Sequence, residues 1–113
     1  MKSKVSPELT RRFPEPTANE LKQAAVNYVI ARGGLAWVNN VGRALGINFG
    51  GPVGSGDVIG LYRGKFLSIE VKVGKDRLTE KQIEWMSDVN RRGGVAFLAN
   101  SMRHVEEVIE AIK

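Results

Sequence analysis

Asp57, Glu70 and Lys72 are the residues of this sequence whose types and spacing most clearly offer chemistry. They lie in a stretch where two short apolar runs flank the pair Arg63-Gly64, a pattern typical of a β-hairpin with a tight turn. If the turn has two residues, Asp57 lies directly opposite Glu70 on the neighbouring strand. Carboxylates that close repel each other and require a cation, and oxygen ligands suit a hard ion such as Mg²⁺. Lys72 would balance the charge and point at whatever the ion binds.

Period-two alternation on the second strand places Ser68, Glu70 and Lys72 on one face and the apolar side chains on the other. The apolar face is expected to join the core. The polar face has a second interpretation, as a solvated surface that carries an ordinary salt bridge. The register also depends on the turn, because Arg-Gly is a weaker type I′ signal than Asn-Gly, and a three-residue loop would separate the two carboxylates.

The order and spacing of several short motifs resemble the VRR-NUC (virus-type replication-repair nuclease) family of the PD-(D/E)xK, restriction-endonuclease-like superfamily. The resemblance covers roughly residues 17 to 100, with one departure, because a glycine stands where the wider superfamily often has proline. The motifs are Glu20 on a first helix, Gly56-Asp57 at the start of a strand, Ile69-Glu70-Val71-Lys72, and Leu78-Thr79-Glu80-Lys81-Gln82 at the start of the next helix.

The resemblance implies a phosphodiesterase that depends on Mg²⁺ or Mn²⁺. The metal ligands that it implies are Asp57, Glu70 and the carbonyl group of Val71. Lys72 would orient the attacking water and offset charge on the phosphate oxygens. The full set of catalytic residues that it implies is Glu20, Asp57, Glu70, Lys72 and Gln82.

DNA is the substrate that the resemblance implies, with branched DNA such as a Holliday junction as the leading candidate and a role in replication, repair or recombination. Stand-alone members of the family resemble junction resolvases, which act as homodimers. Nicking or end-trimming of flapped or duplex DNA is an alternative within the same chemistry. A non-catalytic, basic DNA-binding module that retained the nuclease fold is the alternative from another class.

Two helix starts carry the capping-box pattern, in which the third helical side chain bonds back to the residue before the helix. In the helix expected over 17–32, Glu20 could serve this purpose or the active site. In the helix expected from residue 79 to about 92, Gln82 falls on an inward stripe with Ile83, Met86 and Val89. Gln82 could likewise cap its own helix or contact a metal-bound water or a phosphate.

The first helix is expected to pack through a stripe of Leu21, Ala24, Ala25 and Tyr28. A short strand over 36–39 follows, with Trp37 as a core candidate. Residues 40–56 are rich in glycine and predict a long loop, either a disordered surface loop or a strip that folds around a DNA strand. The residues expected to contact nucleic acid are Arg43, Ser55, Lys75, Arg77 and Lys81.

The remaining elements complete an α/β fold. Residues 95–99 form an apolar strand of the type that lies inside a mixed sheet, and a closing helix packs through Val105, Val108, Ile109 and Ile112. Trp85 lies off the inward stripe of its helix, which hints at an interface with another chain. The expected architecture is restriction-endonuclease-like, a central mixed β-sheet flanked by helices in the order α-β-β-β-α-β-α.

Composition limits the other possibilities. The 113 residues suit a basic N-terminal arm over 1–16 and a single domain over 17–113. A net charge of +5 favours a polyanionic partner. The chain has no cysteine and one histidine, which argues against disulfides, thiolate chemistry and His-rich metal sites. No signal-peptide pattern, long apolar run or phosphate-binding glycine motif is present. We therefore expect a cytoplasmic protein that does not associate with a membrane and does not use a nucleotide cofactor.

Overall fold

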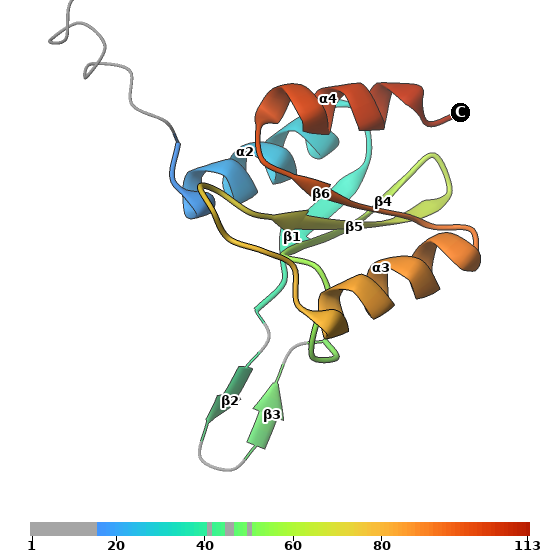
Figure 1. Cartoon of the computed structure of the whole chain (residues 1–113). Coiled ribbons are helices and arrows are strands. Elements are labelled where there is room, and N and C mark those ends of the chain that lie inside the picture. Colours follow the sequence, from blue (N-terminus) through green and yellow to red (C-terminus); the bar gives the residue numbers. More distant parts are fainter. Residues whose placement is uncertain (1–15, 41, 45–46, 50) are drawn as a thin grey trace, which may run out of the picture.

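The computed structural model describes residues 16–40, 42–44, 47–49 and 51–113. The expected basic arm lies outside the described residues, except for Pro16. Figure 1 shows a β-sheet with helices on both faces. In chain order the elements are α2 (Ala18–Ala31), β1 (Leu35–Val38), β2 (Gly42–Ala44), β3 (Ile47–Phe49), β4 (Val58–Tyr62), β5 (Lys65–Val71), α3 (Glu80–Arg91), β6 (Val95–Ala99) and α4 (Met102–Ala111).

Four strands form a mixed sheet in the spatial order β1-β4-β5-β6. The β1–β4 and β4–β5 pairs are antiparallel, and β5–β6 is parallel. The mixed sheet is therefore confirmed, but β6 lies at its edge rather than inside it. The long loop expected over 40–56 is wrong in part, because β2 and β3 pair into a separate two-stranded ribbon. The element order thus contains two strands more than expected.

The β4–β5 hairpin has the two-residue turn that places the carboxylates opposite each other. Tyr62 pairs with Lys65 across the turn. Arg63 has φ 51° and Gly64 has φ 81°, and positive φ at both central positions defines a type I′ turn. The ladder then runs to the pair Val58–Ile69, and one further step of the same register brings Asp57 opposite Glu70.

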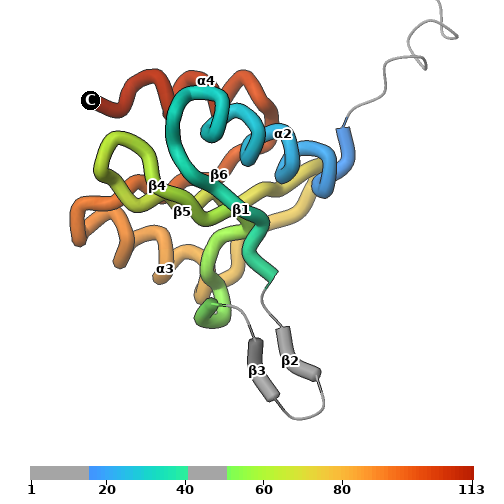
Figure 2. Tube along the Cα trace, turned by 180° about the vertical axis from the view of Figure 1, so that it is seen from behind, coloured from blue at the N-terminus to red at the C-terminus, as the bar shows by residue number. Residues whose placement is uncertain are grey.

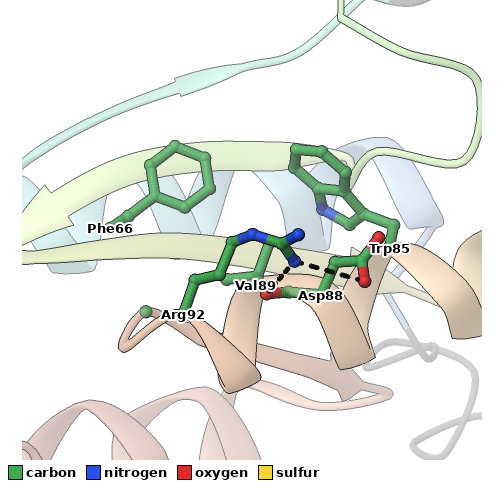
Figure 3. A pocket seen from close by; sticks show the side chains of 6 residues that line it. Phe66, Trp85, Asp88, Val89 and Arg92 are labelled. Atoms are coloured by element: carbon green, nitrogen blue, oxygen red, sulfur yellow. Dashed lines mark hydrogen bonds and ion pairs between the residues drawn. The ribbon is translucent and has the colours of Figure 1, made fainter.

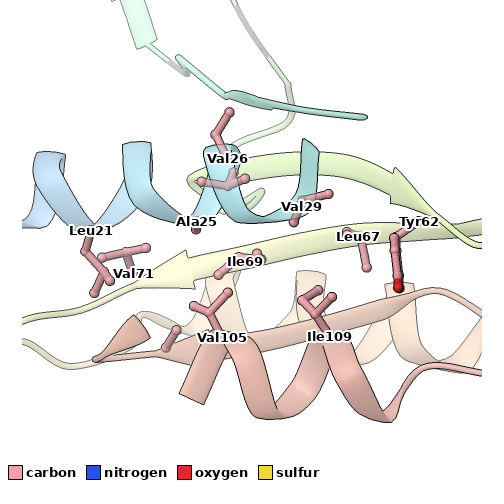
Figure 4. Packing of buried hydrophobic residues seen from close by; sticks show 12 residues of the cluster. Leu21, Ala25, Val26, Val29, Tyr62, Leu67, Ile69, Val71, Val105 and Ile109 are labelled. Atoms are coloured by element: carbon pink, nitrogen blue, oxygen red, sulfur yellow. The ribbon is translucent and has the colours of Figure 1, made fainter. Parts of the chain in front are cut away.

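One face of the sheet carries the core, seen from close by in Figure 4. α2 packs across β1, β4 and β5 on this face, and α4 packs on α2 and β6. α2 buries Leu21, Ala25, Val26 and Val29. The predicted stripe of this helix is confirmed at Leu21 and Ala25, and Tyr28 packs against the core while partly buried. The stripe is wrong at Ala24, which is only partly buried, and it missed Val26 and Val29. In α4, Val105 and Ile109 are buried as predicted, Ile112 packs against the core, and Val108 is only partly buried.

The opposite face is covered only in part. α3 contacts β5 and β6, and Figure 2 shows it on the far side of the sheet from α2 and α4. Trp85 faces the sheet, because its Nε1 donates to Ser68 Oγ at 2.7 Å and its ring meets Phe66 edge to face. Trp85 is partly buried by contacts within its own chain, and the interface that its position suggested stays a prediction. Ile83, which the sequence placed inward, is 53% exposed.

Over β1 and β4, no described helix lies on this second face. Leu35 pairs with Leu61, which pairs with Phe66, so these three side chains share the face, and all three are exposed. Trp37 lies on the same face and is 54% exposed, so its assignment to the core is wrong. Its alternation within the strand is as expected, but no described helix packs on that side of β1.

None of the described helices is long and apolar enough to span a bilayer.

Candidate active site

Asp57 and Glu70 meet at the end of the β4–β5 hairpin that is opposite the turn. Asp57 lies directly before β4, and its Oδ2 accepts a hydrogen bond from the Val71 N–H at 2.7 Å. Glu70 lies in β5 and is only 3% exposed. The Asp57 carboxyl group lies close enough to Glu70 to raise the pKa of the Glu70 carboxyl group. The structure therefore brings together the carboxyl pair that the hairpin register predicts.

This contact changes the protonation of Glu70. Burial raises the pKa of Glu70, and the hydrogen bond and negative charge of Asp57 raise it further, to about 8, although Lys72 and Lys22 act in the opposite direction. Near neutral pH the pair therefore holds one proton between its two carboxyl groups. A divalent cation could take the place of this proton, because it would satisfy both carboxylates at once.

Two lysines border the pair, and the sequence predicted only one of them. Lys72 Nζ lies 3.8 Å from Glu70 Oε2, and Lys22 Nζ lies 3.6 Å from Asp57 Oδ1. Lys22 was missed because the predicted stripe of α2 was displaced. With Val26 recognised as buried, Lys22 stands one turn before it at the edge of the packed face, from which a long side chain can reach the sheet.

Gln82 caps its own helix, as one of its two interpretations predicted, and also contacts the carboxyl pair; its contact with a metal-bound water or a phosphate stays a prediction. Its Oε1 accepts from the Thr79 N–H at 2.8 Å, which completes the capping box of α3. Its Nε2 donates to Glu70 Oε2 at 3.0 Å. An amide can do this because it carries an acceptor and a donor on the same carbon.

Glu20 has only one of its two candidate contacts. Its Oε1 accepts from the Thr17 N–H at 2.8 Å, and its own N–H donates to the Thr17 hydroxyl group. The residue is exposed, and no hydrogen bond in the described part of the chain joins it to Asp57 or Glu70. Its assignment to the active site stays a prediction.

Asn39 holds the segment that presents Asp57, and sequence reasoning missed this residue. Its N–H donates to the Asp57 carbonyl, and its Nδ2 donates to both Ser55 Oγ and the Gly56 carbonyl at 2.9 Å. A Cβ on Gly56 would lie 2.3 Å from Ser68 Oγ, so the close approach to β5 requires glycine. Ser55, expected to contact nucleic acid, is 8% exposed and accepts this internal hydrogen bond.

The other residues expected to contact nucleic acid lie around the start of α3 or in the ribbon. Lys75, Arg77 and Lys81 are all exposed. The backbone of Arg43 belongs to β2, but its side chain lies outside the described residues. The contacts of these cations with nucleic acid stay predictions.

The donor set fits a hard divalent ion that keeps part of its water. Among the described residues no group of three or more His, Cys, Asp or Glu side chains could hold an ion. Mg²⁺ is commonly bound by one or two carboxylates, with waters and substrate phosphate as its other ligands. The Asp57–Glu70 pair supplies such a set, and the Val71 carbonyl as a further ligand stays a prediction.

A cavity of about 370 Å³ lies elsewhere, between β5 and α3. Figure 3 shows its lining, with the rings of Phe66 and Trp85 on one side and the ion pair of Asp88 and Arg92 on the other. None of the carboxyl pair or its lysines lines this cavity. This cavity is therefore separate from the carboxyl pair.

Comparison with known protein families gives a match. The family model described as VRR-NUC domain matches residues 11–103, which include every residue of the carboxyl site. No curated protein is similar enough to count as a relative.

Proposed function

The chain belongs to the VRR-NUC family, and from this premise we propose that it is a Mg²⁺- or Mn²⁺-dependent DNA endonuclease with a restriction-endonuclease-like fold. The family implies a nuclease-type function with DNA as the substrate. The metal dependence and the active site are our proposal. The observation that carries it is the buried Glu70 carboxyl group, which the hairpin register places opposite Asp57 and which Lys72 borders.

In this proposal Asp57 and Glu70 hold the ion, with the Val71 carbonyl as an additional ligand. A bound Mg²⁺ or Mn²⁺ would polarise the scissile phosphate and acidify the attacking water. The water oxygen bonds to phosphorus, and the bond from phosphorus to one sugar oxygen breaks, so that this oxygen leaves with a proton.

Lys72 is well placed to act on the phosphate. Its N–H donates to the Ala99 carbonyl at 3.1 Å, which fixes its backbone to β6, and its side chain is 20% exposed. A partly desolvated ammonium group interacts more strongly with the charge that grows on the phosphate oxygens. Gln82 holds Glu70 in place through its Nε2. Glu20 is the weakest member of the proposed set, because its carboxylate is engaged in the helix cap.

Branched DNA and a homodimer are the finer parts of the proposal. A two-fold dimer would present two sites to paired strands, as in junction resolvases. The exposed side chains of Leu35, Trp37, Leu61 and Phe66 support a contact with another copy, because apolar groups that share one sheet face gain from burial. Sedimentation of the wild type measures this directly, and a monomer at all concentrations would contradict it.

The test of the hydrolytic function is cleavage of labelled four-way junction, flap, duplex and single-stranded DNA, with Mg²⁺ or with EDTA. We expect cleavage with Mg²⁺ only, and a loss of about a hundredfold or more in Lys72→Ala. Lys113→Ala is the matched control, because it removes an exposed lysine that has no part in the proposed chemistry or DNA contacts.

Absence of cleavage of all four substrates would favour the non-catalytic DNA-binding module. Cleavage by Lys72→Ala at the wild-type rate would mean that the active site is assigned wrongly. Symmetric cuts on opposed strands of the junction would support the resolvase-like part of the proposal.

A further inference from the structure

Lys22 is positioned at the site by the packing of α2. The neighbouring Leu21 is 1% exposed, and Val26, one turn later, is 5% exposed. The side chains of Lys22 and Asp57 are 23% and 25% exposed, far less than those of a freely solvated surface pair. The lysine stem therefore lies along the edge of the core, and the ammonium group is delivered to Asp57.

The two oxygens of Asp57 have different partners. Oδ2 accepts the Val71 N–H at 2.7 Å, and Oδ1 lies 3.6 Å from Lys22 Nζ. The backbone bond fixes Oδ2, so Oδ1 is the oxygen that can exchange its partner. A cation that binds between the two carboxyl groups would use this oxygen, and Lys22 competes for it.

The charges of the site lead to the same conclusion. A divalent ion between the two carboxyl groups would place two positive charges, in exchange for at most one proton, close to the ammonium groups of Lys22 and Lys72. This repulsion disfavours Lys22 at its present distance. A phosphate of the substrate brings negative charge to the same place and offers the displaced ammonium group a new partner.

We propose that Lys22 is a displaceable counter-cation of the active site. It balances Asp57 when no divalent ion is bound, yields Oδ1 to the ion, and then contacts a phosphate oxygen of the DNA strand. This inference rests on the proposed metal-dependent function. It makes Lys22 a positioning residue that weakens metal binding in the absence of DNA and strengthens DNA binding in its presence.

A lysine that only tethers α2 to Asp57 would behave differently. Its removal would loosen the carboxylate and weaken metal binding. When Lys22 is replaced by a neutral residue, a counter-cation role predicts tighter metal binding and a tethering role predicts weaker metal binding.

The first experiment measures the affinity of the full chain for Mn²⁺ by calorimetry, without DNA. Lys22→Met replaces the ammonium group by a neutral side chain of similar length, and Lys113→Met removes one positive charge from an exposed position. We expect Lys22→Met to bind Mn²⁺ about tenfold more tightly than the wild type, which corresponds to about 1.4 kcal/mol. Lys113→Met is expected to remain within about twofold of the wild type, because exposed charges are screened.

The second experiment measures the binding of duplex and junction DNA in Ca²⁺ over a range of salt concentrations. Lys22→Met is expected to bind DNA more weakly and to reduce the slope of log K against log salt by about 1, the loss of one phosphate contact. Lys22→Arg, which retains the charge, is expected to retain the slope.

The outcomes separate this inference from the proposed function. If the wild type cleaves DNA with Mg²⁺ but Lys22→Met binds Mn²⁺ no more tightly than Lys113→Met, the counter-cation role alone is overturned. An unchanged salt slope in Lys22→Met overturns the phosphate contact. If neither the wild type nor Lys22→Met binds Mn²⁺, this inference and the metal-dependent function are both overturned.

Discussion

The first turns of α2 and α3 are built alike but contribute differently to the site. Both helices follow a threonine, and in both the third helical side chain bonds back to the threonine N–H at 2.8 Å. At α3 that side chain is an amide, and its free donor reaches Glu70. At α2 it is a carboxylate, which has no donor to offer, and the contact with the site comes from Lys22 instead. The same local pattern therefore leaves one helix start as a cap and makes the other a support of the carboxyl pair.

The largest difference that we expect between the two helix starts concerns the pH dependence of stability. Only α3 contacts Glu70, the carboxyl group with the raised pKa, through Gln82. The folded pKa of Glu70 is raised from 4.5 to about 8, so between these values the folded protein keeps a proton that the unfolded chain releases. The stability that this proton contributes is full below about pH 4.5 and is lost as the pH rises to about 8. Urea denaturation in EDTA over this range should show the free energy of unfolding of the wild type falling relative to that of Glu70→Gln.

Glu70→Gln is informative because its amide stays neutral at every pH in the range. The difference between the two proteins should therefore grow with pH in favour of the variant. A constant difference would mean that the Glu70 pKa is not raised, and that the two carboxyl groups are not in contact.

A smaller difference is expected between alanine substitutions at the two helix starts. Gln82→Ala removes a cap bond and leaves the buried Glu70 short of a partner, so we expect the free energy of unfolding to fall by about 2 kcal/mol. Glu20→Ala removes one exposed hydrogen bond and should cost about 0.5 kcal/mol. Urea denaturation measures both. Equal losses of unfolding free energy in the two variants would mean that Gln82 supports Glu70 no more than Glu20 does.

The smallest effect is expected when the glutamate that caps α2 is exchanged for the glutamine type that caps α3. Glu20→Gln retains the acceptor that the cap uses, so its free energy of unfolding should stay within about 0.5 kcal/mol of the wild type. Gln82→Glu retains the cap in the same way but replaces the donor to Glu70 by a third carboxyl group. It should destabilise the protein at neutral pH, and more so than Glu20→Gln does. An unchanged free energy of unfolding in Gln82→Glu would mean that the amide donor of Gln82 does not stabilise Glu70.

The parts of the fold that the sequence predicted well are those that local chemistry determines. The Arg63-Gly64 turn fixes the hairpin register, and hence the opposition of Asp57 and Glu70. The two threonine caps follow from residue types three positions apart. Each of these features requires no knowledge of which element packs against which.

The errors arise where burial depends on distant parts of the chain. Trp37 has the apolar character of a core residue, but no described helix covers its side of β1. Trp85 and Ile83 exchange their expected exposures because the angle at which α3 meets β5 decides which side chains face inward. Lys22 belongs to a helix on the other face of the sheet, and its contact with Asp57 is visible only when the layers are assembled.

The central claim is that Asp57 and Glu70 together form one binding site for a divalent ion. Calorimetric titration of Mn²⁺ into the wild type, Asp57→Asn and Glu70→Gln tests it most directly, with Glu84→Gln, at an exposed position outside the proposed site, as the matched control. We expect the wild type and Glu84→Gln to bind the ion with similar affinity, and either substitution in the pair to weaken binding by about a hundredfold or more, since each removes one of two charged ligands. Wild-type affinity in Glu70→Gln or in Asp57→Asn would contradict the claim.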